Sequence, residues 1–327
     1  MLIDLLTHKT FINCVLAIIN YSFFIINYST HPAYMKKVVI AGGTGFIGSY
    51  LTKRFIETGY QVLIVSREPR YVSWNPVDLI ESLENAELVI NLAGKSINCP
   101  HSEENKKAIL DSRIDATNRI GNALLACKNP PGLWINGSAS GIYKPSPNHG
   151  MTEDETDLGD DFLADVVRQW EKAFFEFDLP DTRKVALRTS VVLGRNGGAL
   201  LPLLWLSRFG LGGKQATGNQ MFSWIHVEDY FRILEYLIEN KTLEGILNCT
   251  SPEPVNNKEF MCAIRKTIHM PVGIPAPEFA ISLGAKIIGT EPELILNSSF
   301  VIPKCLMDSG FKFIFPDIHT ALADLLM

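Results

Sequence analysis

The sequence predicts an α/β protein: a doubly wound parallel sheet with a small C-terminal α/β region on the substrate side. Three observations predict it. The apolar run Lys37–Ala41 leads into a glycine-rich segment and then a helical pattern. From Met35 onward, strand-like apolar runs alternate with helical stretches, which is typical of a parallel sheet covered on both faces. After Gly194 this alternation loosens and glycines become frequent, which indicates a separate region near a ligand cleft.

The segment 42–48, with the sequence GGTGFIG, predicts a phosphate-binding turn between the first strand and the first helix. Gly42 permits the tight turn, Gly45 lets the backbone approach a pyrophosphate, and Gly48 lets the helix pack closely on the strand. The helix then follows with apolar residues at four-residue spacing. Since strand, loop, helix and second strand arrive in order, we expect a dinucleotide-binding fold of the Rossmann type.

The second strand, Gln61–Val65, ends in Ser66 and Arg67 rather than in an acidic residue. An NAD-binding protein usually places Asp or Glu here to accept hydrogen bonds from the adenosine ribose. A hydroxyl and a guanidinium instead match the charge and geometry of a 2′-phosphate. The sequence therefore predicts NADP(H) as the cofactor, with a solvated loop arginine as the alternative interpretation.

The remaining elements can be placed by their periodicity. We expect strands over 88–92, 133–136, 184–187 and 246–248, helices over 103–127, 162–177 and 280–288, and a further helix that starts with the segment 223–229. We expect residues 35–195 and 224–250 to form the nucleotide-binding domain, and residues 196–223 and 251–327 the substrate-side region.

Composition excludes several classes of protein. The chain has 327 residues and a formal net charge of −5 without a long basic run, so nucleic acid is not an expected partner. Its six cysteines are scattered with no C-x-x-C pair, which predicts reduced thiols, no metal site and an intracellular protein. The cytoplasm is the expected compartment, with the mitochondrion as the alternative.

Residues 1–34 are expected to lie outside the fold. The run 11–28 is apolar and uncharged, about the minimum length for a membrane span. A signal anchor, a cleaved targeting peptide and an upstream extension of a start at Met35 are the three interpretations. The absence of a cleavage site and the regular spacing of three asparagines favour the extension, so we expect no membrane association unless 11–28 is an anchor.

These landmarks resemble the extended short-chain dehydrogenase/reductases of the NAD(P)-dependent epimerase/dehydratase group, and within it the epimerase-like family 39U. The resemblance covers about 35–327 and is carried by GGTGFIG at 42–48, NLAGKSI at 91–97, LRTSVVLGRNGGAL at 187–200 and WIHVEDY at 224–230. It implies a cofactor site formed by Gly42, Thr44, Gly45, Phe46, Ile47, Gly48, Ser66, Arg67, Leu92, Ala93, Gly94, Arg113 and Leu193.

The chain departs from this pattern at the proton relay. Short-chain reductases usually use a tyrosine and a lysine four residues later, and the lysine cation lowers the tyrosine pKa. The corresponding positions here are Leu163 and Val167, and no Tyr-x-x-x-Lys occurs anywhere in the chain. Ser138 and Tyr143 are the remaining catalytic candidates, while His226 is expected to organise the loop before its helix.

Two functions follow from the sequence. The first is an NADP(H)-dependent oxidoreductase or epimerase-like enzyme with a rearranged proton relay, acting on an unidentified small molecule. The second is a non-catalytic NADP(H)-binding protein, such as a redox sensor or an assembly protein. The sequence predicts neither the substrate nor the oligomeric state.

Overall fold

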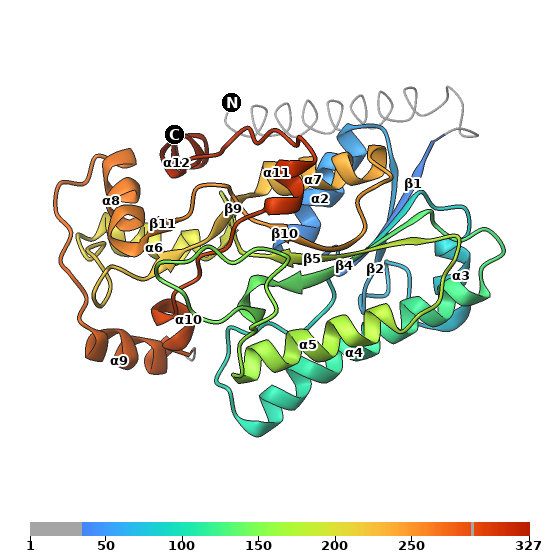
Figure 1. Ribbon diagram of the computed structural model, residues 1–327, viewed down its shortest axis with the longest axis horizontal. Coiled ribbons are helices and arrows are strands. Elements are labelled where there is room, and N and C mark those ends of the chain that lie inside the picture. The colour runs from blue at the N-terminus through green and yellow to red at the C-terminus, as the bar shows by residue number, and fades with distance from the viewer. Residues whose placement is uncertain (1–34, 289–290) are drawn as a thin grey trace, which may run out of the picture.

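The computed structural model describes residues 35–288 and 291–327 (Figure 1). Its centre is a parallel sheet in the order β2-β1-β3-β4-β5-β10. The strands are β1 (Lys37–Ala41), β2 (Gln61–Val65), β3 (Leu88–Asn91), β4 (Leu133–Ala139), β5 (Arg183–Thr189) and β10 (Gly245–Cys249). Because strand order reverses between β1 and β3, the carboxyl edge at this point is where such sheets bind ligands.

Helices cover both faces of the sheet, as Figure 1 shows. Helices α2 (Phe46–Glu57) and α7 (Val227–Glu239) pack on one face, and α3 (Pro76–Leu83), α4 (Glu103–Ala126) and α5 (Phe162–Phe175) on the other. Strand β1 shows why: alternate side chains of a strand point to opposite faces, and all of its apolar residues are buried. The predicted α/β class and doubly wound parallel sheet are confirmed.

The chain after β5 builds a smaller layer beside the sheet. Strands β6 (Val191–Gly194), β7 (Gly197–Gly198) and β9 (Trp224–His226) form one short sheet, and β8 (Met221–Phe222) pairs with β11 (Val255–Asn256). The helices are α6 (Leu200–Arg208), α8 (Asn257–Thr267), α9 (Glu278–Ile288), α10 (Glu293–Leu296), α11 (Lys304–Asp308) and α12 (Ile318–Leu326), with a 3-10 turn at Ser140–Ile142. Helices α6, α8 and α12 enclose a separate apolar cluster around Trp224 and Phe260.

The C-terminal segment crosses the predicted domain division. Leu306 and Phe311 pack into the cluster that lies under α2 and α7, on one face of the central sheet. Asp229 of α7 is fully buried and accepts the backbone N–H groups of Ile314 and Phe315 at 2.9 and 2.8 Å. The division at 195, 224 and 250 therefore stays a prediction, with residues 304–315 bound to the larger unit.

Local geometry explains the entry to α7. His226 lies at the N-terminus of this helix, where its Nδ1 accepts the backbone N–H of Glu228 at 3.1 Å. The His226 ring also stacks on Phe315 with centroids 3.9 Å apart. The residue thus organises the start of the helix, as its sequence context predicts. None of the helices within 35–288 and 291–327 is long and apolar enough to cross a membrane, and the apolar run 11–28 lies outside these residues.

Candidate functional site

The glycine turn after β1 has no room for side chains. Gly42 has a φ of +80°, and a Cβ there would lie 2.8 Å from the Leu92 carbonyl carbon. A Cβ on Gly48 would lie 2.4 Å from the Gly42 oxygen, so α2 can approach β1 this closely only with glycine at that position. Gly45 precedes α2 and has no side chain to cap it, which leaves first-turn N–H groups available to an anion.

Two cavities meet at this turn and form a continuous cleft along the carboxyl edge of the sheet. They share Gly42, Gly45 and Leu92 as lining residues. The first cavity, of about 590 Å³, extends from Phe46, Ile47 and Gly48 towards β4, β5 and the segment 297–303 between α10 and α11, which we call the strap. The second, of about 880 Å³, extends towards the end of β2 and is also lined by Thr44, Ala93 and Gly94. The sequence-predicted turn therefore lies at the centre of the cleft.

Ser66 and Arg67 line the second cavity at the end of β2, as predicted. The exposed Arg67 side chain projects from a loop in which the Ser66 hydroxyl accepts the N–H of Glu68. Trp74 and Arg119 line the same cavity, and the Arg119 guanidinium donates to the Trp74 carbonyl at 3.2 Å. This end of the cleft thus offers two guanidinium groups and an aromatic ring.

Arg113 lines the first cavity. Its guanidinium donates to the carbonyl of Lys95 at 3.0 Å and lies over the Trp170 ring at 5.2 Å. A Cβ on Gly94 would lie 3.3 Å from this side chain, so the strand-end loop and the arginine are in close contact. Burial lowers the pKa of Arg113 to about 10, which still leaves it charged at neutral pH.

Leu193 differs from the other predicted cofactor residues. Its side chain is fully buried in the apolar cluster that α6 and α8 enclose, and it is not among the described residues that line either cavity. The reason is the pairing of β6 with β9, which turns the side chain inward. Instead, the Phe46 ring fills this corner, because a Cβ on Gly194 or Gly197 would lie within 2.8 Å of it.

Ser138 and Tyr143 are joined by a buried polar network. The Ser138 hydroxyl donates to Glu171 Oε1 at 2.6 Å, and Arg188 binds both oxygens of Glu171 at 2.8 Å. A third guanidinium nitrogen of Arg188 donates to the Tyr143 hydroxyl at 2.9 Å, and that hydroxyl donates to Asn248 Oδ1 at 2.8 Å. Both candidates line the first cavity, but their hydrogens are given to protein acceptors.

Comparisons with known proteins agree with this geometry. Residues 38–164 match the NAD dependent epimerase/dehydratase family, and residues 276–325 match a domain of unknown function, DUF1731. The chain is 37% identical to the epimerase family protein YfhF of Bacillus subtilis, over 88% of this chain and 97% of that protein. It is 35% identical to mouse epimerase family protein SDR39U1, over 88% of this chain and 99% of the relative.

This chain belongs to the NAD-dependent epimerase/dehydratase family. Its relatives place it in the epimerase-like 39U group, so the resemblance seen in the sequence is confirmed. A crystal structure of human SDR39U1 (isoform 2) with NADPH is 31% identical, with a TM-score of 0.81, and the match covers 88% of this chain and 98% of that one. A nucleoside-diphosphate sugar epimerase from Corynebacterium glutamicum is 28% identical, with a TM-score of 0.71 over 90% of this chain and 58% of that one.

This family member has no proton-transfer pair at the usual helix positions. Leu163 and Val167 of α5 both line the first cavity, where the tyrosine and lysine of short-chain reductases would project. Burial raises the pKa of the Tyr143 hydroxyl even though Arg188 and Asn248 contact it, so Tyr143 does not have the lowered pKa that the lysine gives the tyrosine of short-chain reductases. Among residues 35–288 and 291–327, no three His, Cys, Asp or Glu side chains are grouped to hold a metal ion.

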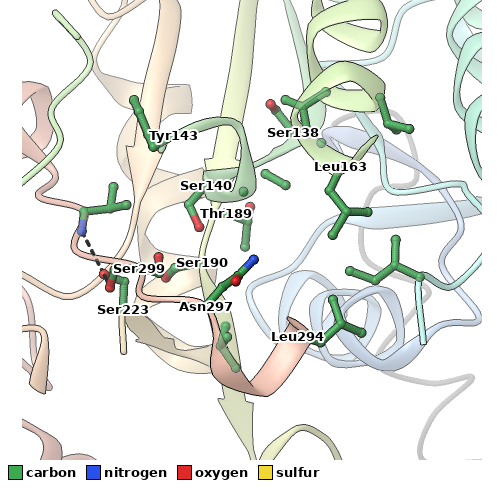
Figure 2. Close-up of a pocket in the computed structure, with 18 of the residues that line it drawn as sticks. Ser138, Ser140, Tyr143, Leu163, Thr189, Ser190, Ser223, Leu294, Asn297 and Ser299 are labelled. Atoms are coloured by element: carbon green, nitrogen blue, oxygen red, sulfur yellow. Dashed lines mark hydrogen bonds between the residues drawn. The ribbon is translucent and has the colours of Figure 1, made fainter. Parts of the chain in front are cut away.

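Sequence reasoning missed a second set of polar residues in the first cavity. Figure 2 shows the side chains of Ser140, Thr189, Ser190 and Asn297 converging on one space. Thr189 ends β5 and Ser190 follows it at the carboxyl edge, a position that could have been recognised from the strand prediction. Asn297 comes from the strap after α10, more than a hundred residues away, and no local pattern indicates it.

Proposed function

We propose that this chain binds NADP(H) along the cleft, with the adenosine end at β2 and the nicotinamide end in the first cavity. The observation that carries the proposal is the meeting of the two cavities at Gly42 and Gly45. A pyrophosphate there would receive the N–H groups at the start of α2 and the positive end of its dipole. The NADPH complex of the human relative supports the proposal.

The residues present fit the group. A Cβ at Gly42 or Gly48 would collide with backbone atoms, so this turn can offer its N–H groups to a phosphate without side chains in the way. Ser66 and Arg67 would hold the 2′-phosphate, as the hydroxyl and guanidinium at the end of β2 already line the cavity. Arg113 would contact the cofactor in the first cavity.

Thermal unfolding with NADPH, NADP⁺, NADH and NAD⁺ tests this proposal, and Arg67→Ala is the decisive variant. At a hundredfold excess over the dissociation constant, NADPH should stabilise the protein by about 2.7 kcal/mol. Arg70→Ala is the matched control, because Arg70 is exposed in the same loop but pairs with Glu68 at 2.9 Å. No stabilisation by any of the four nucleotides would contradict the proposal.

We further propose that the protein is an NADP(H)-dependent oxidoreductase or epimerase-like enzyme acting on a small molecule in the first cavity. When bound, the nicotinamide would supply the hydride chemistry. Ser138 would position the substrate by accepting a hydrogen bond, because its own hydrogen is given to Glu171. With Leu163 and Val167 in place of the usual pair, a water molecule or the Ser140 hydroxyl would supply the proton.

One observation favours a second function, a non-catalytic NADP(H)-binding protein. The proton donors of related enzymes are replaced by two apolar side chains, and Tyr143 is held by Arg188 and Asn248. Loss of a general acid lowers a rate by a factor of about 10²–10⁴, which is enough to abolish useful turnover.

NADPH oxidation with a panel of aldehydes and ketones distinguishes the two functions. The enzyme hypothesis predicts turnover that falls in Ser138→Ala while the NADPH-dependent thermal shift is retained. A protein that binds NADPH normally but oxidises it at the same rate with and without every carbonyl compound would support the non-catalytic alternative.

A further inference from the structure

Part of the first cavity, away from Arg113, is lined by hydroxyl groups, and we name this part the hydroxyl compartment. It is the space between Ser140, Thr189, Ser190 and Asn297 (Figure 2). The proposed function gives the opposite end of the cavity to the cofactor, so this compartment is left for the substrate. The chemistry of its side chains restricts what that substrate can be.

The hydrogens of Thr189 and Ser190 point away from the compartment. Thr189 Oγ1 donates to the Leu187 carbonyl at 3.1 Å, and Ser190 Oγ donates to the Cys249 carbonyl at 3.3 Å. A carbonyl oxygen only accepts hydrogen bonds, so in both pairs the hydroxyl must be the donor. Each side chain therefore presents oxygen lone pairs to a ligand.

Other hydroxyls in the cavity wall follow the same pattern. Ser223 donates to the Ser299 carbonyl at 2.8 Å and accepts the Val301 N–H at 2.8 Å, so its hydrogen is not available to a ligand. Ser138 gives its hydrogen to a carboxylate. These hydroxyl groups can therefore accept hydrogen bonds from a ligand but cannot donate to it.

Two side chains remain free to donate. Among the described residues, no hydrogen-bond partner is found for the Ser140 hydroxyl or the Asn297 amide, and both face the compartment (Figure 2). They lie on opposite sides of the space, one at the end of β4 and the other on the strap. A ligand between them would meet one donor from each side and acceptors from Thr189 and Ser190.

The charges around the compartment do not suit an anion. Within the described chain, the cations that line the cavity are Arg113, at the cofactor end, and Lys144, which forms an ion pair with Asp157. Two carboxylates, Asp161 and Glu293, also line it. A diphosphate usually needs guanidinium, ammonium or several N–H donors, and here the two carboxylates among the lining residues offset the two cations.

We propose that the hydroxyl compartment binds a small uncharged compound carrying neighbouring hydroxyl groups, such as a free sugar or polyol, and not a nucleoside diphosphate sugar. Hydroxyl groups can both donate to the lone pairs of Thr189 and Ser190 and accept from Ser140 and Asn297. Phosphate oxygens only accept, so they would face acceptors and carboxylates. The inference rests on the proposed function for which end of the cavity the cofactor takes.

Thermal unfolding of the full chain, with and without saturating NADPH, tests the proposal with D-glucose and UDP-glucose as probes. D-glucose should raise the melting temperature, and UDP-glucose at equal concentration should leave it unchanged. Ser140→Ala and Asn297→Ala should each weaken the glucose effect by roughly fivefold, as expected for loss of one hydrogen bond. Ser282→Ala on α9, outside the cavity, is the matched control and should bind as the wild type does.

Three results would overturn the proposal: stabilisation by UDP-glucose, with or without stabilisation by glucose; stabilisation by neither compound; or unchanged glucose binding in both variants. The NADPH shift is measured separately, before any sugar is added. Its absence contradicts the proposed cofactor site, whereas its presence without a glucose response contradicts only the substrate class. Thermal unfolding with glucose but without NADPH tests sugar binding whether or not NADPH binds.

Discussion

Replacing Glu171 by glutamine should be among the most destabilising single substitutions in the part of the chain that forms the central sheet. Glu171 is 7% exposed and Arg188 is 3% exposed, and the carboxylate receives two guanidinium hydrogen bonds and one from Ser138. Burial alone lowers the pKa of Arg188, but the hydrogen bonds and charge of Glu171 outweigh it and raise the pKa overall. Glu171→Gln keeps the size of the side chain and removes the charge, so the guanidinium stays buried and uncompensated.

The expected loss follows from this geometry. Removing one partner of a buried ion pair costs about 3–5 kcal/mol, because the remaining charge has already lost its hydration. In a chain of this size each kcal/mol lowers the melting temperature by about 2 °C, so the expected decrease is roughly 6–10 °C. Glu176→Gln is the matched control at the C-terminus of the same helix, since its contact with Lys172 is exposed and 3.8 Å long.

Urea denaturation and calorimetry of Glu171→Gln, Glu176→Gln and the double variant Glu171→Leu/Arg188→Met would check the prediction. The double variant removes both charges together and should be more stable than Glu171→Gln. If Glu171→Gln lost less than about 1 kcal/mol, or no more than Glu176→Gln, the network would not hold the site together and the reasoning would be refuted.

Three further predictions concern other parts of the fold. Gly48→Ala should weaken NADPH binding and cost roughly 1–3 kcal/mol, because the new methyl would lie 2.4 Å from the Gly42 oxygen; nucleotide titration and urea denaturation would measure both effects. Asp229→Asn should destabilise the protein by roughly 2–3 kcal/mol and release the C-terminal segment to proteolysis, since the buried carboxylate accepts two backbone N–H groups. Burial lowers the pKa of His226 below its ordinary 6.5, so as the pH falls the unfolded chain takes up this proton before the folded chain does. The free energy of unfolding, measured by urea denaturation, should therefore decrease as the pH drops below about 6.5. This decrease should be smaller in His226→Gln and the same as in the wild type in His319→Gln.

The sequence predicted the parts of the fold that depend on local pattern. The strands β1 and β2 have the predicted bounds, and the turn between β1 and α2 has the predicted conformation, because glycine spacing and apolar periodicity are properties of adjacent residues. Local pattern was also enough to locate Leu163 and Val167, since their positions on α5 follow from counting along one helix.

Contacts between distant segments could not be predicted in the same way. The ion pair of Glu171 with Arg188 joins a helix to a strand. The hydrogen bond of Glu171 with Ser138 forms only because β4 lies beside β5 in the sheet. Leu193 was assigned to the cofactor from family resemblance alone, whereas the turn of β6 against β9 buries its side chain elsewhere. Only the assembled sheet shows which of these side chains share a face.

The direction of hydrogen bonds decides the chemistry of this cleft more than the types of residue in it. A sequence reader who finds Ser138 and Tyr143 near a strand end expects proton donors, because hydroxyl groups can donate. In the fold, each of these hydroxyls gives its hydrogen to Glu171 or Asn248, and the charge of Arg188 is already neutralised. The same side chains are therefore acceptors towards the cavity, and a protein that has lost the usual tyrosine and lysine must obtain its proton from another group or solvent, or not transfer one at all.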